Sequence, residues 1–116
     1  MKKVTEVTVK ALAQWKTKKL WNSEVCYGLS TYDYYLHDNL IAMYEPYKNR
    51  LWISDAGWQT NTTKERLNWI LRQFKLWRIF QKDYKWYLSD ETWLHEWTWQ
   101  KEFNWIERDA LFYNQN

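Results

Sequence analysis

Glycine, proline and cysteine are scarce in this sequence, which has two Gly, one Pro and one Cys among its 116 residues. So few glycines leave little material for the glycine-built loops that cradle phosphates or present a nucleophile at a sharp turn. The single cysteine, Cys26, excludes an intramolecular disulfide and a zinc site built from cysteines. A disulfide-stabilised domain and the common nucleotide-binding motifs are therefore not expected.

Long apolar segments are also missing. No uninterrupted apolar run approaches the roughly 20 residues that a membrane-spanning helix needs. Two lysines, Lys2 and Lys3, follow the first residue, but no apolar segment comes after them, so a secretory signal is not expected. Together with the lone cysteine, which suits a reducing compartment, these absences predict a cytoplasmic protein.

Aromatic residues, by contrast, are abundant: 11 Trp, 9 Tyr and 4 Phe. A chain of this length is expected to form one domain spanning residues 1–116. Folding buries about two-thirds of the unfolded surface, which gives a hydrophobic core. The core cannot hold every apolar side chain, because these make up 46% of the residues. Roughly a dozen should stay partly exposed, and these are candidates for binding.

The net charge of +3 is small but unevenly distributed. Residues 1–19 carry six Lys and one Glu, and residues 64–85 carry seven basic and two acidic residues. Residues 89–109 carry six acids and two bases. This alternation is compatible with neighbouring solvated faces that neutralise each other. The alternative, which is less favoured, is separate basic and acidic faces that each meet a partner.

Hydrophobic periodicity predicts helices at the start and in the middle of the chain. Residues 5–18 repeat apolar side chains at three- and four-residue spacings, as one face of a helix does. A second helix is predicted to begin at Thr62, because Thr62 and Glu65 have the spacing of a capping box. Its core face is formed by Leu67, Ile70, Leu71 and Phe74.

Short apolar runs separated by turn residues predict strands on both sides of the second helix. Those before it are residues 34–36, 39–44 and 50–54, and those after it are a β-hairpin formed by 77–81 and 84–88. The two-residue turn of that hairpin is predicted to be Lys82-Asp83.

A C-terminal helix is predicted over residues 99–110, where apolar side chains share a helical face. Residues 90–98 fit either a helix start or a strand. The fold class that follows is α+β: an antiparallel sheet of about four or more strands, with the capped helix packed on one face and helices at both termini.

No arrangement of residues in the sequence points to catalysis. The two histidines, His37 and His95, lie far apart and lack metal-ligand spacing, so no metal site is predicted. Cys26 lies in an apolar and aromatic stretch typical of a small core residue. We therefore assign no catalytic residue and no cofactor, and we expect a protein that is not an enzyme.

Two segments carry a family resemblance: NLIA at residues 39–42 and GWQTNTTKERLN at residues 57–68. This order resembles small proteins encoded by bacteriophages and related mobile elements, in which a hairpin leads through the second segment into a helix. The resemblance covers residues 20–90 and implies a phage protein with an α+β fold, located in a host bacterial cell. Residues 91–116 depart from the pattern as an aromatic, acidic C-terminal extension.

The same resemblance implies a class of function. Small phage proteins of this kind are frequently inhibitors of host defences, including anti-CRISPR proteins. A host defence protein such as a Cas effector is therefore the partner that the resemblance implies.

Trp69 is the clearest candidate for contact with such a partner. It lies about 200° around the second helix from the core residue Leu67, and Trp and Arg dominate the binding energy of interfaces. The alternative is that Trp69 packs beneath the C-terminal extension. The residues predicted to bind a partner are Arg66, Trp69, Arg72, Trp93, Trp97 and Trp99.

Nucleic-acid binding through residues 64–87 is the second hypothesis, and self-association is a third. The basic residues would be Lys64, Lys75, Arg78, Lys82 and Lys85, and the stacking platforms would be Trp69, Trp77 and Trp86. Because Arg66 and Lys75 fall on opposite sides of the second helix, the basic stripe is broken there. A protein partner is therefore favoured over nucleic acid.

Overall fold

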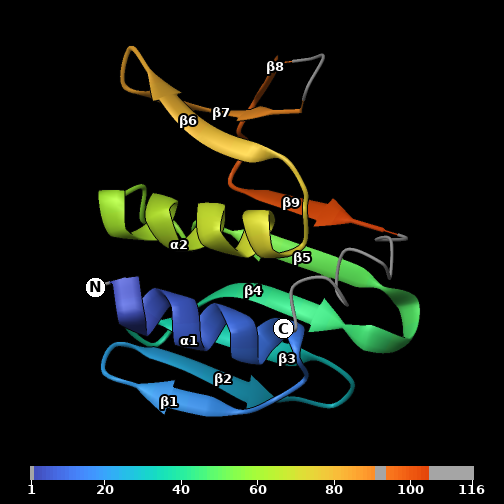
Figure 1. The fold of residues 1–116 in the computed structure, drawn as a ribbon. Helices are drawn as coiled ribbons and strands as arrows, with labels where there is room; N and C mark the ends of the chain where they lie inside the picture. The colour runs from blue at the N-terminus through green and yellow to red at the C-terminus, as the bar shows by residue number, and fades with distance from the viewer. Residues whose placement is uncertain (1, 91–93, 105–116) are drawn as a thin grey trace.

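The computed structural model describes residues 2–90 and 94–104, which form two helices and nine strands (Figure 1). The helices are α1 (Lys2–Ala13) and α2 (Asn61–Gln73), and a short 3-10 turn, η1, spans Pro46–Lys48. The strands are β1 (Lys18–Leu20), β2 (Ser23–Tyr27), β3 (Tyr32–Leu36), β4 (Asn39–Glu45), β5 (Arg50–Ser54), β6 (Arg78–Lys82), β7 (Lys85–Ser89), β8 (Leu94–Glu96) and β9 (Gln100–Phe103).

The strands form two antiparallel sheets. The larger sheet has the order β1-β2-β3-β4-β5-β9, so five strands follow one another as a meander and β9 returns to pair with β5. The smaller sheet has the order β6-β7-β8 and lies at one end of the molecule, with β6 against α2 (Figure 1). The predicted antiparallel sheet of four or more strands is therefore confirmed, and so is the α+β class.

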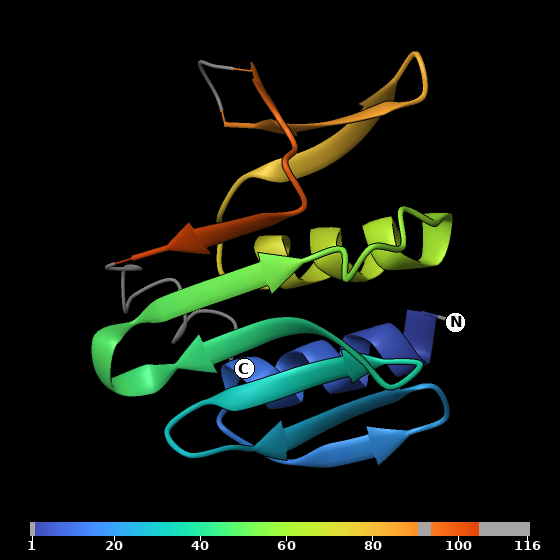
Figure 2. The same cartoon turned by 180° about the vertical axis from the view of Figure 1, so that it is seen from behind.

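Both helices lie on the same face of the larger sheet, as the two opposite views in Figures 1 and 2 show. The core is formed where α1 and α2 meet this face. It includes Leu12 of α1 and Tyr34 and Ile53 of the sheet, each fully buried. The predicted core face of α2 is confirmed, because Leu67, Ile70, Leu71 and Phe74 are all buried.

The middle of α2 is fixed to the smaller sheet by an asparagine. The Asn68 side chain donates to the carbonyl of Ile79 at 2.8 Å and accepts from the amide of Ile79 at 2.7 Å. This pair of bonds satisfies both backbone groups of one β6 residue, and it sets the position of the hairpin against α2.

The predicted start of α2 is wrong by two residues. The N-cap is Thr60, whose hydroxyl accepts from the amide of Thr63 at 3.1 Å. Thr62 lies inside the helix, and Glu65 turns toward Thr5 instead of closing a capping box. Three threonines near the helix start offer similar caps, and the path of the preceding loop selects among them.

Two other predicted boundaries also differ. Helix α1 ends at Ala13 instead of residue 18, because the chain turns at Trp15, which has a φ of 59°, to enter β1. The turn of the β6–β7 hairpin is Asp83-Tyr84, since Lys82 pairs with Lys85. Both turn residues have positive φ, 52° and 65°, as a type I′ turn requires.

The C-terminal helix predicted over residues 99–110 is wrong for the residues that the structure describes. Residues 100–103 form β9, and the carbonyl of Trp99 accepts from the amide of Asp55 at 3.0 Å. Pairing with β5 therefore overrides the local helical periodicity, as tertiary contacts commonly do. Residues 105–110 of the predicted helix lie outside the described residues. Neither helix of the described residues has the length and apolar character needed to cross a bilayer.

Candidate functional site

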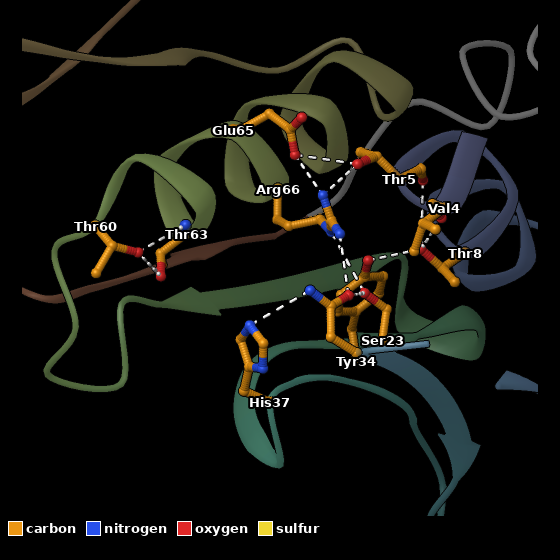
Figure 3. A network of polar contacts seen from close by, with 11 residues as sticks. Val4, Thr5, Thr8, Ser23, Tyr34, His37, Thr60, Thr63, Glu65 and Arg66 are labelled. Carbon is orange, nitrogen blue, oxygen red and sulfur yellow. Dashed lines mark hydrogen bonds and ion pairs between the residues drawn. The ribbon is translucent and has the colours of Figure 1, made fainter. Parts of the chain in front are cut away.

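Arg66, which was predicted to contact a partner, is fully buried. Its guanidinium donates to Thr5 of α1 and to Glu65, and its Nη2 reaches Asn22 Oδ1 at 3.2 Å (Figure 3). Its Nε donates to Ser23 Oγ at 3.4 Å. Arg66 thus joins both helices to the start of β2, and its predicted role at the surface is wrong because no part of it reaches solvent.

Trp97 was also predicted to contact a partner at the surface, but it is buried. Its indole N–H donates to Asp55 Oδ2 at 2.9 Å. Trp69 is half-buried against the core, and Arg72 lies over its ring at 5.4 Å. Trp99 is 56% exposed. Of the six predicted contacts, Arg72 and Trp99 are therefore exposed and Trp69 is partly so, while Trp93 lies outside the described residues.

The face of the larger sheet opposite the helices is covered by no element of the described residues (Figure 2). Antiparallel sheets with one wet face normally alternate apolar and polar residues. Here four apolar side chains on the wet face are half-buried, and we call this group the open sheet face: Tyr35, Leu40, Met43 and Trp52. The register places Tyr35 beside Leu40 and Met43 beside Trp52.

Charged side chains surround the open sheet face. Arg50 contacts Glu45 at 3.2 Å and Glu102 at 3.5 Å at one side. Glu24 pairs with Tyr35 across β2 and β3 at the other. An apolar centre with a charged rim is the usual anatomy of a protein-binding surface.

A hollow of about 360 Å³ lies at one end of the open sheet face, and Tyr35 forms part of its wall. Trp21, in the β1–β2 turn, also lines it and is 70% exposed. Trp21 has a φ of 53°, a left-handed conformation that a bulky residue rarely adopts. Trp15, Asp83 and Tyr84 share this conformation at other turns, so it is the exposed indole beside the hollow that marks Trp21 as a candidate contact.

His37 separates this hollow from a second one on the helix side. The second hollow has a volume of about 370 Å³ and is walled by Ile41, Trp58 and Thr63 among others. Asn22 Nδ2 lies 3.3 Å from His37 Nε2, within hydrogen-bond distance, and Asn22 Oδ1 accepts from Arg66 (Figure 3). The buried polar network therefore holds the turn that forms the wall between the two hollows.

His95 and Cys26 lie apart from these hollows. His95 stacks on Trp77 with ring centres 5.1 Å apart. Burial raises the pKa of the Cys26 thiol, and a hydrogen bond and the charge from Glu24 raise it further. Among the described residues, no cluster of three or more His, Cys, Asp or Glu could hold a metal ion.

The basic residues predicted to bind nucleic acid do not form one continuous surface. Arg78, Lys82 and Lys85 lie on one face of the β6–β7 hairpin. Lys64 reaches Gln81 on the other face at 3.3 Å, and Lys75 lies in the loop between α2 and β6. Of the predicted stacking residues, Trp86 is buried and Trp77 packs edge-on against Phe103.

Sequence reasoning missed the open sheet face, although one signal pointed to it. Residues 40–44 form an unbroken apolar run, Leu-Ile-Ala-Met-Tyr, where a strand with one wet face should alternate. Such a run is typical of strands covered on both faces. The structure covers only one face of β4 among the described residues, which leaves the other available to a partner.

Comparison with protein families finds a match between residues 1–112 and the Kyanoviridae Gp96 protein. No curated protein and no solved structure matches the chain. The match includes residues 20–90, which carry the resemblance, and extends beyond them on both sides. The chain belongs to the Kyanoviridae Gp96 protein family and is a phage protein.

Proposed function

We propose that the protein is a non-enzymatic binding protein that inhibits a host defence protein, as anti-CRISPR proteins do. The observation that carries the proposal is the open sheet face, where Tyr35, Leu40, Met43 and Trp52 lie half-buried with no described element over them. Covering such a patch removes apolar area from water at about 25 cal/mol per Å². A partner supplies that cover.

Trp21 is the expected anchor of the interface. It is 70% exposed and lines the hollow that Tyr35 also borders, so it adjoins the open sheet face. Large aromatic side chains at the edge of a pocket carry much of the binding energy in protein complexes. The rim carries both signs of charge, because Glu102 contacts Arg50 and Glu24 pairs with Lys19 across β1 and β2. The partner is therefore expected to present a polar rim of mixed charge around its own apolar patch.

Capture from a lysate of the host bacterium with Trp21→Asn tests the proposal. Asparagine tolerates the left-handed conformation, so the variant loses the indole without adding strain to the turn. Trp15→Asn is the matched control, because Trp15 is also exposed and left-handed but lies beyond the other end of β1. We expect Trp21→Asn to weaken capture of a defence protein at least about 30-fold, a loss of about 2 kcal/mol. Trp15→Asn should leave capture unchanged.

Inhibition itself is tested on the purified defence protein. The double variant His95→Ala with Cys26→Ala should inhibit as well as the natural protein, because neither residue is assigned a chemical step and neither lines the hollow beside Trp21. Loss of inhibition with unchanged circular dichroism and melting temperature would contradict the non-enzymatic proposal. Failure of the natural protein to capture any defence protein would contradict the inhibitor proposal.

A further inference from the structure

The outer face of the β6–β7 hairpin combines aromatic and basic side chains. Phe80 pairs directly with Tyr87, and their rings stack with centres 5.7 Å apart and an angle of 27° between planes. Arg78 and Lys82 lie two residues to either side of Phe80, so side-chain alternation puts them on the same face. We call this set the hairpin platform: Arg78, Phe80, Lys82, Lys85 and Tyr87.

Two lysines of the hairpin platform repel each other in the absence of a ligand. Lys82 and Lys85 are direct cross-strand partners, and both are exposed. Like charges directly opposite each other destabilise a strand pair. Among the described residues, neither these lysines nor Arg78 takes part in an ion pair. An anionic ligand would relieve this repulsion, which marks the platform as an anion-binding surface.

The aromatic pair favours an anion that also carries flat rings. Phe80 and Tyr87 are only half-buried, and the hairpin buries its other face, with Ile79, Trp86 and Leu88, against the body of the protein. Half-exposed rings on an open strand face offer flat surfaces on which bases stack. Arg78 and Lys82 are four residues apart, about 13 Å along the strand, with Phe80 midway between them. Phe80 therefore lies between two cationic side chains, each of which can hold a phosphate of the strand that stacks on it.

We propose that the hairpin platform binds single-stranded nucleic acid, with bases stacked on Phe80 and Tyr87 and phosphates held by Arg78, Lys82 and Lys85. Stacking requires bases that are free of a partner strand, so the platform favours single strands over a duplex. Two acids lie close by: Asp83 in the turn and Glu96 opposite Tyr87. They limit the net charge and keep the affinity modest. This site is separate from the open sheet face and does not depend on the proposed inhibition.

Fluorescence anisotropy with the full-length protein tests the proposal. The probes are labelled oligo(dT) and oligo(U) of about 12 nucleotides, within the site sizes of such platforms, and a duplex of the same length. At about 50 mM salt we expect micromolar binding of at least one single strand and at least about tenfold weaker binding of the duplex. Comparison of oligo(dT) with oligo(U) distinguishes DNA from RNA as the preferred ligand.

Two variants separate stacking from charge. The double variant Phe80→Leu and Tyr87→Leu keeps apolar bulk on the strands but removes both rings, and it should weaken binding at least about tenfold. The double variant Lys82→Gln and Lys85→Gln should make the log–log salt slope shallower, from about −2 for three phosphates to about −0.7 for one. Lys16→Gln with Lys18→Gln is the matched control, because it removes two exposed lysines far along the chain from the hairpin.

Several outcomes would overturn the proposal. These are no binding of either single strand at low salt, equal binding of the duplex, and equal losses from the control and the platform lysines. Binding unaffected by removal of both rings would show an attraction between charges alone. If the platform variants instead abolish capture of a protein while no oligonucleotide binds, the surface serves a protein partner. Circular dichroism of each variant identifies a loss that comes from unfolding. The variant with Lys82→Gln and Lys85→Gln changes only exposed side chains and carries the test if the ring variant does not fold.

Discussion

Asp55 and Trp97 form a buried hydrogen bond that joins the two sheets of the protein. The indole N–H of Trp97 donates to Asp55 Oδ2 at 2.9 Å, and both residues are less than a tenth exposed. Asp55 directly follows β5 of the larger sheet, and Trp97 directly follows β8 of the smaller one. The same carboxylate accepts from the amide of Gly57 at 2.7 Å and from Gln59 at 3.1 Å. It therefore also shapes the loop that leads into α2.

Replacing Trp97 by phenylalanine should destabilise the protein by about 1.5–3 kcal/mol. Phe keeps an aromatic ring in the site but leaves the buried carboxylate of Asp55 with one donor fewer. Urea denaturation followed by circular dichroism measures the loss. Trp99→Phe is the control, since Trp99 is exposed and should change stability by no more than about 0.5 kcal/mol. Equal effects at the two positions would show that the bond to Asp55 contributes nothing.

The two threonines near the start of α2 should respond differently to alanine. Thr60→Ala removes the hydroxyl that accepts from the amide of Thr63, and it should cost about 1 kcal/mol. Thr62→Ala removes a hydroxyl from within the first turn and should cost only a few tenths. Thermal melts of the two variants provide the comparison. A larger loss at Thr62 would restore the capping box that the sequence predicted.

Arg66 should tolerate no replacement, including lysine. Its guanidinium contacts Thr5, Ser23, Asn22 and Glu65 at once, and a lysine ammonium cannot reproduce that fork. Removing one side of a buried charged network costs about 3–5 kcal/mol, a large part of the roughly 5–15 kcal/mol that stabilises a folded domain, so Arg66→Lys should lower the melting temperature strongly. Arg72→Lys, on the exposed side of the same helix, should fold normally, as circular dichroism would show.

How far the sequence predicts this fold depends on whether the deciding contacts are local. The core face of α2 and three strands of the meander, β3 to β5, follow from periodicity and turn residues near in sequence. Strands β1 and β2 are not predicted by these signals, and periodicity assigns residues 16–18 to the first helix. The place of β9 does not, because it depends on pairing with β5 about 50 residues earlier, as in Leu51 beside Phe103. Arg66 was misjudged for the same reason. A charged residue on a helix normally faces solvent. Arg66 can be buried because Thr5 and Asn22, which are distant in sequence, accept hydrogen bonds from its guanidinium.

The thiol of Cys26 should react slowly with alkylating reagents near neutral pH. Burial raises its pKa, and a hydrogen bond and charge from Glu24 raise the pKa further, so less thiolate is present at a given pH. Glu24→Gln should lower this pKa and speed the reaction, as a pH profile of iodoacetamide labelling would show. Because the folded state holds the thiol proton more tightly, the free energy of unfolding falls as the pH rises above the thiol pKa of the unfolded chain. A profile that matches that of a free thiol would contradict the expectation.

The hairpin turn offers a substitution that should stabilise the protein. Asp83 and Tyr84 have φ values of 52° and 65°, and Tyr84 is 94% exposed, so its ring gains little in return for the left-handed backbone. Glycine adopts this conformation without strain, and Asp followed by Gly is favoured in type I′ turns. Tyr84→Gly should therefore raise the free energy of unfolding by about 1 kcal/mol.

Tyr84→Ala is the matched control for that substitution, because it removes the same ring but keeps the strain of a left-handed Cβ. It should give little or no gain in stability. The sign of the effect also tests the register of the hairpin. With the turn at Lys82-Asp83, as the sequence predicted, Tyr84 would be a strand residue, and glycine there would destabilise the protein by about 0.5–1 kcal/mol. Chemical denaturation of the two variants beside the natural protein therefore decides between the two turns, and a loss of stability in Tyr84→Gly would contradict the pairing of Lys82 with Lys85.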